Sequence, residues 1–409
     1  MRKLDIGVVG CGTAGPAAAL FLARQGHRVT IYERVERPRA IGAGIILQPT
    51  GQHVLRRLEL DRYVIERGER LEGLEVLRHG GGPLLALEYA DVSPSYFGVG
   101  SHRGVLFTAL YEAAVAQAGI DLELGVACTG VARERSKLFI LDERGRRRGP
   151  HDLVVAADGA RSRFRDDTGL VRAAEPYPWG ALWFVARDPE HQFQKRLHQI
   201  VRGTRRMLGL LPTGVGPDQV HGEKAGCPLV SLYWSIAEAE VEAWRARFDA
   251  WKEEIVEMEP RAAPVVAQIS GPDDVLFSRY FDVVMRPWNT HSIVYLGDSA
   301  HAMSPQLGQG ANLALWDAMV LADSLELEQG DVVRALYRYS ATRREHLTYY
   351  ETVTRWLTPF FQSEHDVLGV LRDLFMPIAS KIGPLRKAMI LGMTGTAEGS
   401  PFKQLQLGG

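Results

Sequence analysis

The sequence predicts an α/β protein with a Rossmann-like dinucleotide-binding domain, an inserted and mainly β second domain, and a helical C-terminal region. Three observations predict this class. A glycine-rich loop joins an apolar strand to a helix near the N-terminus, a second strand–loop–helix unit spans residues 293–318, and the chain after residue 331 is rich in helix formers. At 409 residues the chain exceeds one ordinary hydrophobic core, so we expect two interlocked domains.

The composition excludes several classes of function. Apolar residues make up 46% of the chain, charged residues 24%, and the formal net charge is -1. No global field therefore favours nucleic acid or an anionic membrane. The three cysteines have no C-x-x-C spacing, which argues against a disulfide framework or a metal site and favours a reducing cytoplasm. The opening run LDIGVV predicts a first strand rather than a signal peptide.

The glycine-rich loop has the spacing G-x-G-x-x-G, at Gly10, Gly12 and Gly15. The first glycine permits a tight turn, the second lets the backbone approach a pyrophosphate, and the third lets helix and strand pack closely. The N-terminus of the following helix attracts the anion, because its N–H groups are unpaired and its dipole end is positive. The spacing therefore predicts a dinucleotide site.

The elements around this loop predict a βαβ unit. Residues 4–9 form an apolar strand, residues 14–25 a helix, and residues 27–33 a second strand that closes at Glu33. An acid at the end of that strand is placed to bind ribose hydroxyls. NAD and FAD share this unit, so it does not decide between them.

A second strand–loop–helix unit supplies another candidate cofactor loop. The apolar strand 293–296 runs into Gly297 and Asp298, and a helix is expected to begin near Asn312. Asp298, at the carboxyl end of the strand, can accept hydrogen bonds from a sugar or ribityl chain. The segment GQGAN at 308–312 offers consecutive backbone N–H groups at a helix start, which suit a partial negative charge.

Four motifs together resemble the class A flavoprotein monooxygenases, the para-hydroxybenzoate hydroxylase type with one FAD on one chain. They are the glycine loop with the YER that ends its second strand, AADGARSRFR at 156–165, GDSAHAMSP with GQGAN, and SHRGVLFTAL with Arg103, Leu106 and Leu110. They follow the family's order and approximate spacing from residue 7 to residue 318. One departure is Trp316, where an acid is expected before Asp317. The resemblance implies FAD and the fold, and it names no substrate.

The resemblance also implies which residues hold the cofactors. Glu33 would bind the adenosine ribose with Arg34 nearby, and Asp298 the ribityl–pyrophosphate portion. Arg161 and Arg165 are candidate contacts of a nicotinamide donor, NADH or NADPH. The remaining implied FAD contacts are Gly10, Gly12, Thr13, Ala14, Gly15, Arg103, Asp158, Pro305, Gly308, Gln309, Gly310, Ala311 and Asn312.

The same anchors predict the domain boundaries. Segments 1–75, 100–175 and 280–330 would form the FAD-binding domain, segments 76–99 and 176–279 the substrate domain, and 331–409 the helical C-terminal region. Strands are expected at 179–187, 199–212 and 228–236, and one or two exposed charged helices at 237–258.

The inserted strands supply candidate substrate contacts. Tyr233 is the candidate for orienting or deprotonating a phenol-like group. Alternation sends only about half of a strand's side chains toward the flavin, and the sequence does not identify which half. We expect Arg202, Arg205 and Arg206 to face solvent, because three arginines buried together are costly without matching acids. Candidate neighbours of the flavin ring or the substrate are Ile46, Gln48, Trp183, Met207 and Leu210.

In the resembled family, NAD(P)H reduces FAD, O2 forms a flavin C4a-hydroperoxide, and that species hydroxylates an electron-rich ring. The resemblance thus implies an FAD-dependent monooxygenase acting on an apolar aromatic or heteroaromatic small molecule. Here the chain offers no C-x-x-C as another electron route and no second complete G-x-G-x-x-G for the nicotinamide donor.

Alternative functions stay open. A flavin-dependent reductase or oxidase of an unsaturated small molecule would share the fold. A flavin-dependent halogenase is disfavoured because its W-x-W-x-I-P motif is absent. A membrane-associated, non-hydroxylating flavoprotein is the third reading, since VLGVLRDLFMPIASKIG could lie on a bilayer. Such apolar stripes more often pack against the neighbouring domains.

Overall fold

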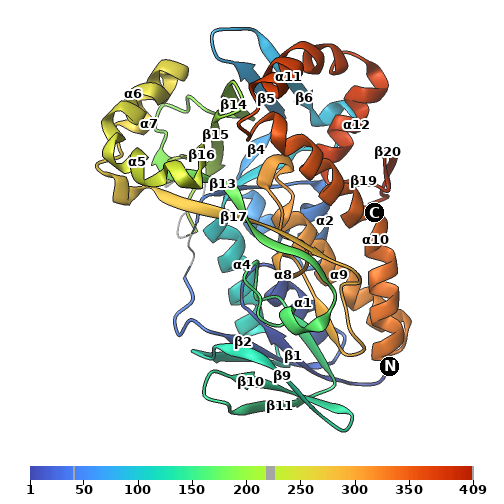
Figure 1. Ribbon diagram of the computed structural model, residues 1–409. Helices are drawn as coiled ribbons and strands as arrows, with labels where there is room; N and C mark the ends of the chain where they lie inside the picture. Colours follow the sequence, from blue (N-terminus) through green and yellow to red (C-terminus); the bar gives the residue numbers. More distant parts are fainter. Residues whose placement is uncertain (40–41, 218–225, 408–409) are drawn as a thin grey trace.

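The computed structural model describes residues 1–39, 42–217 and 226–407, and its lower half in Figure 1 is built on a parallel sheet. The strand order is β18-β12-β1-β2-β8, and every neighbouring pair is parallel. Of these strands, β1, β12 and β18 are nearly continuous apolar runs because the central part of the sheet is covered on both faces, whereas β2 and β8 mix polar and apolar residues. Their bounds are β1 Asp5–Val9, β2 Arg28–Glu33, β8 Ile120–Leu124, β12 Leu153–Ala156 and β18 Ile293–Tyr295.

The helices around this sheet share one core with it. In α1 (Ala14–Arg24) every residue from Ala14 to Ala23 is buried, because the sheet, α4 and α9 surround it. Its run of small side chains allows this close approach. The other helices of this half are α2 Pro49–Arg57, α3 Asp61–Ile65, α4 Arg103–Ala116, α8 Asp298–His301, α9 Gly310–Leu327 and α10 Val332–Leu357. The predicted βαβ unit is therefore confirmed, within a residue or two at each end.

A larger mixed sheet forms the second domain, in the order β17-β13-β16-β15-β14-β5-β6. Its pairs are antiparallel except β14 with β5. One face packs on helices α5 (Val241–Ala246), α6 (Phe248–Met258) and α7 (Ala263–Val266). The strand bounds are β5 Gly73–Arg78, β6 Pro83–Glu88, β13 Val171–Arg187, β14 Arg196–Arg202, β15 Arg206–Gly214, β16 Leu229–Ala237 and β17 Leu276–Met285.

The structure corrects one element of this sheet. Residues 199–212, predicted as a single strand, belong to the β14–β15 hairpin, whose turn includes Gly203 at φ 58°. Because apolar residues lie on both sides of the turn, the sequence pattern does not show that the chain reverses direction there. The predicted boundaries at 175 and 280 fall inside β13 and β17, because these two strands run on, paired with each other, toward the parallel sheet.

The C-terminal region is helical, as predicted, and closes with a short strand pair. It comprises α10, α11 (Asp366–Ala379), α12 (Gly383–Thr394), β19 (Ala397–Glu398) and β20 (Ser400–Gln404). Arg372 of α11 donates to the carbonyl of Gly203 at 3.0 Å, which ties this region to the hairpin. Within residues 1–39, 42–217 and 226–407, no helix is both long and apolar enough to cross a membrane.

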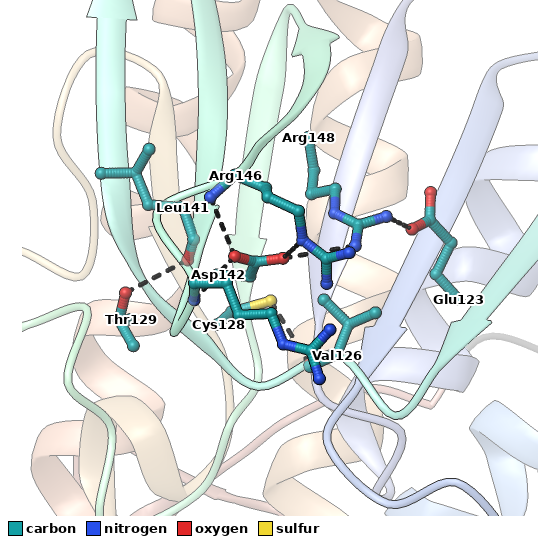
Figure 2. Close-up of polar contacts among 9 residues, drawn as sticks. Glu123, Val126, Cys128, Thr129, Leu141, Asp142, Arg146 and Arg148 are labelled. Atoms are coloured by element: carbon teal, nitrogen blue, oxygen red, sulfur yellow. Dashed lines mark hydrogen bonds and ion pairs between the residues drawn. The ribbon is translucent and has the colours of Figure 1, made fainter.

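Two small sheets complete the fold. The order β3-β7-β4 joins Gly44–Leu47, Gly98–His102 and Glu69–Leu71, and the order β11-β10-β9 joins Arg147–His151, Lys137–Asp142 and Cys128–Glu134. The second of these sheets surrounds a buried carboxylate, that of Asp142 (Figure 2). Arg146 Nε donates to it at 2.7 Å and Arg148 at 3.3 Å, and Arg148 also binds Glu123 of β8. Asp142 thus helps to fix this sheet to the edge of the parallel sheet.

We predict that Asp142→Asn lowers the melting temperature by several degrees at neutral pH. Although burial by itself favours the neutral acid, the hydrogen bonds from Arg146, Arg144 and Arg148 lower the pKa of Asp142 to about 2. A lowered pKa gives stability that is complete above the ordinary value of 3.8 and is lost as the pH falls through about 2. Thermal melts between pH ~4 and ~2 should therefore be flatter for the variant.

The matched control is Glu134→Gln on β9 of the same sheet, whose partner Arg147 is exposed. Exposed pairs contribute little, so its melts should follow those of the wild type. A Glu134 effect as large as that of Asp142 would mean that general surface charge, and not the buried network, sets the acid response.

Candidate active site

The backbone at the three glycines of the first loop has the geometry that their predicted roles require. Gly10 has φ 100°, and a Cβ atom there would lie 2.4 Å from the carbonyl oxygen of Ala157. A Cβ at Gly15 would lie 2.0 Å from the carbonyl oxygen of Gly10, so the helix can sit against the loop only with glycine at this position. At Gly12 no atom lies within 4 Å of that position, which leaves the backbone open to a ligand. Thr13 and Ala14 follow at the N-terminus of α1.

Glu33 is held against this loop. Its Oε2 accepts a hydrogen bond from the N–H of Cys11 at 2.8 Å, and its Oε1 accepts one from Val35 at 3.0 Å. Its own carbonyl accepts from Val126, at the start of the segment that leads into β9. The carboxylate therefore has a fixed position at the end of β2, and Arg34 is exposed beside it.

Arg103 begins α4 and is exposed. Its N–H donates to the carbonyl of Ala43, and a Cβ at Gly42 would lie 2.9 Å from its Cδ. Glycine at position 42 thus lets this chain segment pass against the arginine stem. The side chain lies next to the segment that leads into β3.

The loop after β12 contains an unsatisfied acid. Asp158 Oδ1 is buried and has no hydrogen-bond partner in the described structure. Burial raises the pKa of this carboxyl, although a hydrogen bond with Ser162 and the charge of Arg165 act in the opposite direction. A buried oxygen without a partner is costly, which fits a group that receives its donor from a ligand.

The two arginines of the same loop differ. Arg165 is buried, and it donates to the carbonyls of Ala160 and of Ser299, the latter at 3.0 Å. It joins the two cofactor loops from inside, so its guanidinium does not face a nicotinamide donor as we expected. Arg161 is exposed, with its guanidinium 5.4 Å from the ring centre of Phe281. Between the two, only Arg161 is accessible to such a donor.

The second cofactor loop exposes Asp298 next to the start of α9. Gly297 adopts φ 59°, and Asp298 follows as the first residue of the one-turn helix α8. A Cβ at Gly310 would lie 3.9 Å from Asp298 Oδ1. The carboxylate therefore lies beside the first-turn N–H groups of α9, which have no intrahelical partners. Pro305 and Gly310 are exposed here, and Gly308 and Ala311 are half-buried.

A buried ionic network holds this loop from behind. Asp317 of α9 accepts hydrogen bonds from the N–H of Gly297 at 2.8 Å, from Arg343 at 2.7 Å and from His301 at 2.6 Å. Burial opposes ionisation of both side chains, yet the facing charges raise the pKa of His301 and lower that of Asp317. His301 therefore stabilises the loop and does not act as a base.

The side chains of the GQGAN segment also point into the protein. Asn312 Nδ2 donates to the carbonyls of Ile46 and Gly308, and its Oδ1 accepts from the N–H of Gln48 at 2.9 Å. Gln48 in turn accepts a hydrogen bond from the hydroxyl of Tyr89. Asn312 thus connects the end of β3 to the second cofactor loop, and the backbone is what this segment offers a ligand.

Gln309 is anchored on the other side. Its Nε2 donates to the carbonyls of Gly392 and Met393 in α12, the latter at 2.7 Å. The C-terminal region therefore braces the loop that the sequence assigned to the flavin ring.

One face of the large sheet meets these two cofactor segments. A Cβ at Gly44 of β3 would lie 2.7 Å from Ser231 Oγ of β16. Further along the same strand, the hydroxyl of Ser235 accepts a hydrogen bond from the side-chain amide of Gln362. The amide oxygen of Gln362 in turn accepts one from the hydroxyl of Ser304, the residue directly before Pro305. Tyr233 lies between these two serines and on the same face, because strand residues two apart share a face.

The same face carries Trp183 and Met207 but not Leu210. Trp183 is the register partner of Tyr233, and their ring centres lie 5.1 Å apart. Met207 packs in a cluster with Phe361 that Tyr233 also contacts. Leu210 lies on the opposite face, in the core beneath α6, so it does not line the same space. Burial raises the pKa of Tyr233, so at neutral pH its hydroxyl is a donor and not a base.

Sequence reasoning missed four residues that contact the groups described above. Tyr89 binds Gln48, Arg343 binds Asp317, and both Gln199 and Gly209 lie against Tyr233. One of them carries a local signal, because an isolated glycine within a strand pattern, as at Gly209, marks a close approach. The others become visible only through partners that are distant in sequence.

These observations fit an FAD. The open backbone at Gly12 suits a pyrophosphate, and the carboxylates of Glu33 and Asp298 suit the hydroxyls of a ribose and a ribityl chain. The unpartnered oxygen of Asp158, in the loop after β12, is free to accept a further hydrogen bond. No group of three or more potential ligands for a metal ion occurs in the part of the chain that the structure describes.

Comparisons with known proteins agree with this reading. The family described as "FAD binding domain" matches residues 3–352. The chain is 28% identical to a probable 2-heptyl-3-hydroxy-4(1H)-quinolone synthase of Rhodococcus erythropolis, over 80% of each chain. It is 29% identical to a 3-amino-4-hydroxybenzoate 2-monooxygenase of Streptomyces cremeus, over 84% of each. The crystal structure of pqsL, a probable FAD-dependent monooxygenase from Pseudomonas aeruginosa, superposes with a TM-score of 0.76 at 24% identity, covering 90% of this chain and 100% of that one.

We predict that Asp298→Ala weakens the binding of FAD. A hydrogen bond to a charged group contributes about 1.5–3 kcal/mol, which corresponds to a roughly ten- to hundredfold higher Kd. The measurement is a titration of the apoprotein with FAD, followed by flavin fluorescence. Asp249→Ala, an exposed acid on α6, is the control and should leave the Kd unchanged. Equal Kd values for the two variants would show that Asp298 does not bind the cofactor.

We also predict that Asp317→Asn destabilises the protein strongly. Removing one partner from a buried charge network costs about 3–5 kcal/mol in the free energy of unfolding. Denaturant titration measures this quantity, and the control is Asp323→Asn on the same helix. Asp323 pairs with Arg57 at the surface, where such a pair contributes less than about 1 kcal/mol. Similar losses in both variants would contradict the special role of Asp317.

Proposed function

This chain belongs to the FAD binding domain family, and from that premise we propose that it is an FAD-dependent monooxygenase that hydroxylates an apolar, electron-rich aromatic or heteroaromatic molecule. The observation that carries the proposal is the sheet face at Tyr233. It lies between β3 and the segment that leads to Pro305, so a molecule bound on it would contact both segments assigned to the flavin ring.

The chemistry of this face supports an apolar ring as the substrate. Trp183, Met207 and Phe361 supply aromatic and sulfur-containing surroundings to the Tyr233 hydroxyl. A dry surface of this kind keeps out the water that would compete with the substrate for the oxidant. The names of the two relatives reported above also refer to ring compounds, a quinolone and an aminohydroxybenzoate.

The arginines of the β14–β15 hairpin do not argue for an acidic substrate. Arg202 pairs with Glu254 and Glu257 of α6, and Arg206 pairs with Glu240 and Glu254. These pairs lie on the helical side of the sheet, away from Tyr233. Arg205 is exposed at the turn. The hairpin therefore leaves no unpaired guanidinium on the proposed substrate face.

The residues of the chain would hold the cofactor and prepare the site around it. FAD, when bound and reduced, supplies the electron pair that activates O2 for insertion into the ring. Glu33 would hold the adenosine ribose, Asp158 the pyrophosphate region and Asp298 the ribityl portion. Asn312 fixes the two backbone segments next to the ring, and Tyr233 orients the substrate through its hydroxyl.

The electron donor in this proposal is NADH or NADPH. The chain has no second complete G-x-G-x-x-G, so the donor would approach the flavin without a domain of its own. Arg161 is an exposed cation in the same loop as Asp158 and is the candidate contact for the donor's phosphates.

We predict that the FAD-loaded protein oxidises NADH or NADPH slowly alone and several-fold faster with a suitable ring compound. Closure of the site on a bound substrate is the physical reason, because an activated oxygen species formed without substrate wastes the donor. The assay follows donor consumption over a panel of phenols, hydroxypyridines and quinolones, under isotopically labelled O2. Mass spectrometry should find one labelled oxygen atom in the product.

Two outcomes would contradict the proposal. Donor oxidation that no compound stimulates would describe an oxidase. Stimulated oxidation that yields a product without labelled oxygen would describe a reductase of unsaturated molecules.

A further inference from the structure

A single row of residues crosses four strands of the large sheet on the proposed substrate face. Gln199 of β14 is the register partner of Gly209 of β15, Gly209 is the partner of Tyr233 of β16, and Tyr233 is the partner of Trp183 of β13. Register partners project to the same side of a sheet, so these four positions share one face.

Glycine at position 209 lets Tyr233 lean across β15. A Cβ atom at Gly209 would lie 1.8 Å from Cζ of the Tyr233 ring, so the ring occupies the space of the missing side chain. In this position the phenol oxygen reaches Gln199, whose Nε2 donates a hydrogen bond to it across the intervening strand. Any larger residue at 209 would displace the ring from this position.

Trp183 is also fixed in place. A hydrogen bond joins its side chain to that of Tyr280 in β17, and the indole N–H is its donor, because an indole cannot accept. Its ring lies at 40° to the ring of Tyr233, with 5.1 Å between their centres. The row thus offers an aromatic wall next to one hydroxyl of fixed direction.

The hydrogen bond from Gln199 determines what this hydroxyl can do. A phenol oxygen has one proton to donate, and here the oxygen already accepts from the amide. Among the described residues, no acceptor is recorded for the proton of Tyr233. Because burial raises the pKa of Tyr233, the proton stays on the oxygen at neutral pH and is available to a bound molecule.

We propose that Gln199, Gly209 and Tyr233 form a specificity subsite that recognises an oxygen acceptor, a ring carbonyl or phenolate, on the substrate. This proposal rests on the proposed function and deepens it by naming the substituent that is recognised. Tyr233 contacts the substrate, whereas Gln199 and Gly209 are positioning residues that aim its hydroxyl. The substrate is therefore a ring compound that carries an acceptor oxygen, and its N–H or O–H donors are not read here.

Three small bicyclic probes test the subsite on the FAD-loaded enzyme. N-methyl-4-quinolone carries an acceptor oxygen and no donor, indole carries a donor and no acceptor oxygen, and N-methylindole carries neither. Binding is followed by the perturbation of flavin absorbance and by tryptophan fluorescence. We expect the quinolone to bind the wild type at least tenfold more tightly than either indole.

The variants separate the three residues. Tyr233→Phe and Gln199→Leu should each weaken the quinolone about tenfold and leave both indoles within twofold, since one neutral hydrogen bond is lost. Gly209→Ala should weaken it similarly although Tyr233 and Gln199 are both still present. Tyr337→Phe, which removes the hydroxyl of an exposed tyrosine on α10, is the control and should change nothing. Should Gly209→Ala fail to fold, the other two variants decide the question.

The outcomes are distinct. The subsite is overturned if the three probes bind alike, or if Tyr233→Phe weakens all of them equally, because a purely structural role would not select the acceptor. A preference for indole over the quinolone would also overturn it. If the quinolone depends on Tyr233 while no ring compound yields labelled product, the subsite stands and hydroxylation fails.

Discussion

Asp317 makes the contacts on which the geometry of the site depends. One fully buried carboxylate receives the N–H of Gly297, the imidazole of His301 and the guanidinium of Arg343. These groups come from the turn before Asp298, from α8 and from α10, so the charge joins the second cofactor loop to the C-terminal region. The network extends through His346, whose imidazole contacts Arg343 on one side and the carbonyl of Gly395 on the other. An unpaired charge at this depth would be too costly to keep, so every partner must be in place.

The loop held in this way matters because hydrogen bonds connect it to three other parts of the fold. Asn312 joins it to the end of β3, Gln309 joins it to α12, and Ser304 joins it through Gln362 to β16. Polar hydrogen bonds hold these elements together, and the aromatic face of the large sheet lies next to them. Such an arrangement holds a flat ring between rigid elements, and it leaves the identity of the substrate to a few side chains of the sheet.

The fold could be predicted where the signal is local. The turn at Gly10, the close packing at Gly15 and the acid at Glu33 depend on residues within one βαβ unit, and the structure confirms each of these positions. The strand and loop around Asp298 follow the same logic. The prediction of a single strand over 199–212 was wrong. Both strands of the hairpin are apolar, and Gly203 is the one residue between them that indicates a turn. Arg165 was a candidate contact of a nicotinamide donor, but the structure buries it against two carbonyls, one of them from a distant loop that its sequence neighbours could not reveal.

The sequence by itself determined the βαβ unit and the fold class, because these depend on spacing and periodicity along the chain, and its four motifs together indicated FAD through their family resemblance. Only the tertiary structure decided which face of the large sheet meets β3 and the segment before Pro305, and therefore that Trp183 and Met207 lie on this face while Leu210 does not. It also decided that Gly209 admits the ring of Tyr233 and that Gln199 meets its hydroxyl. The physical reason is that a strand alternates its side chains between two faces, and the face that is covered depends on elements from distant parts of the chain.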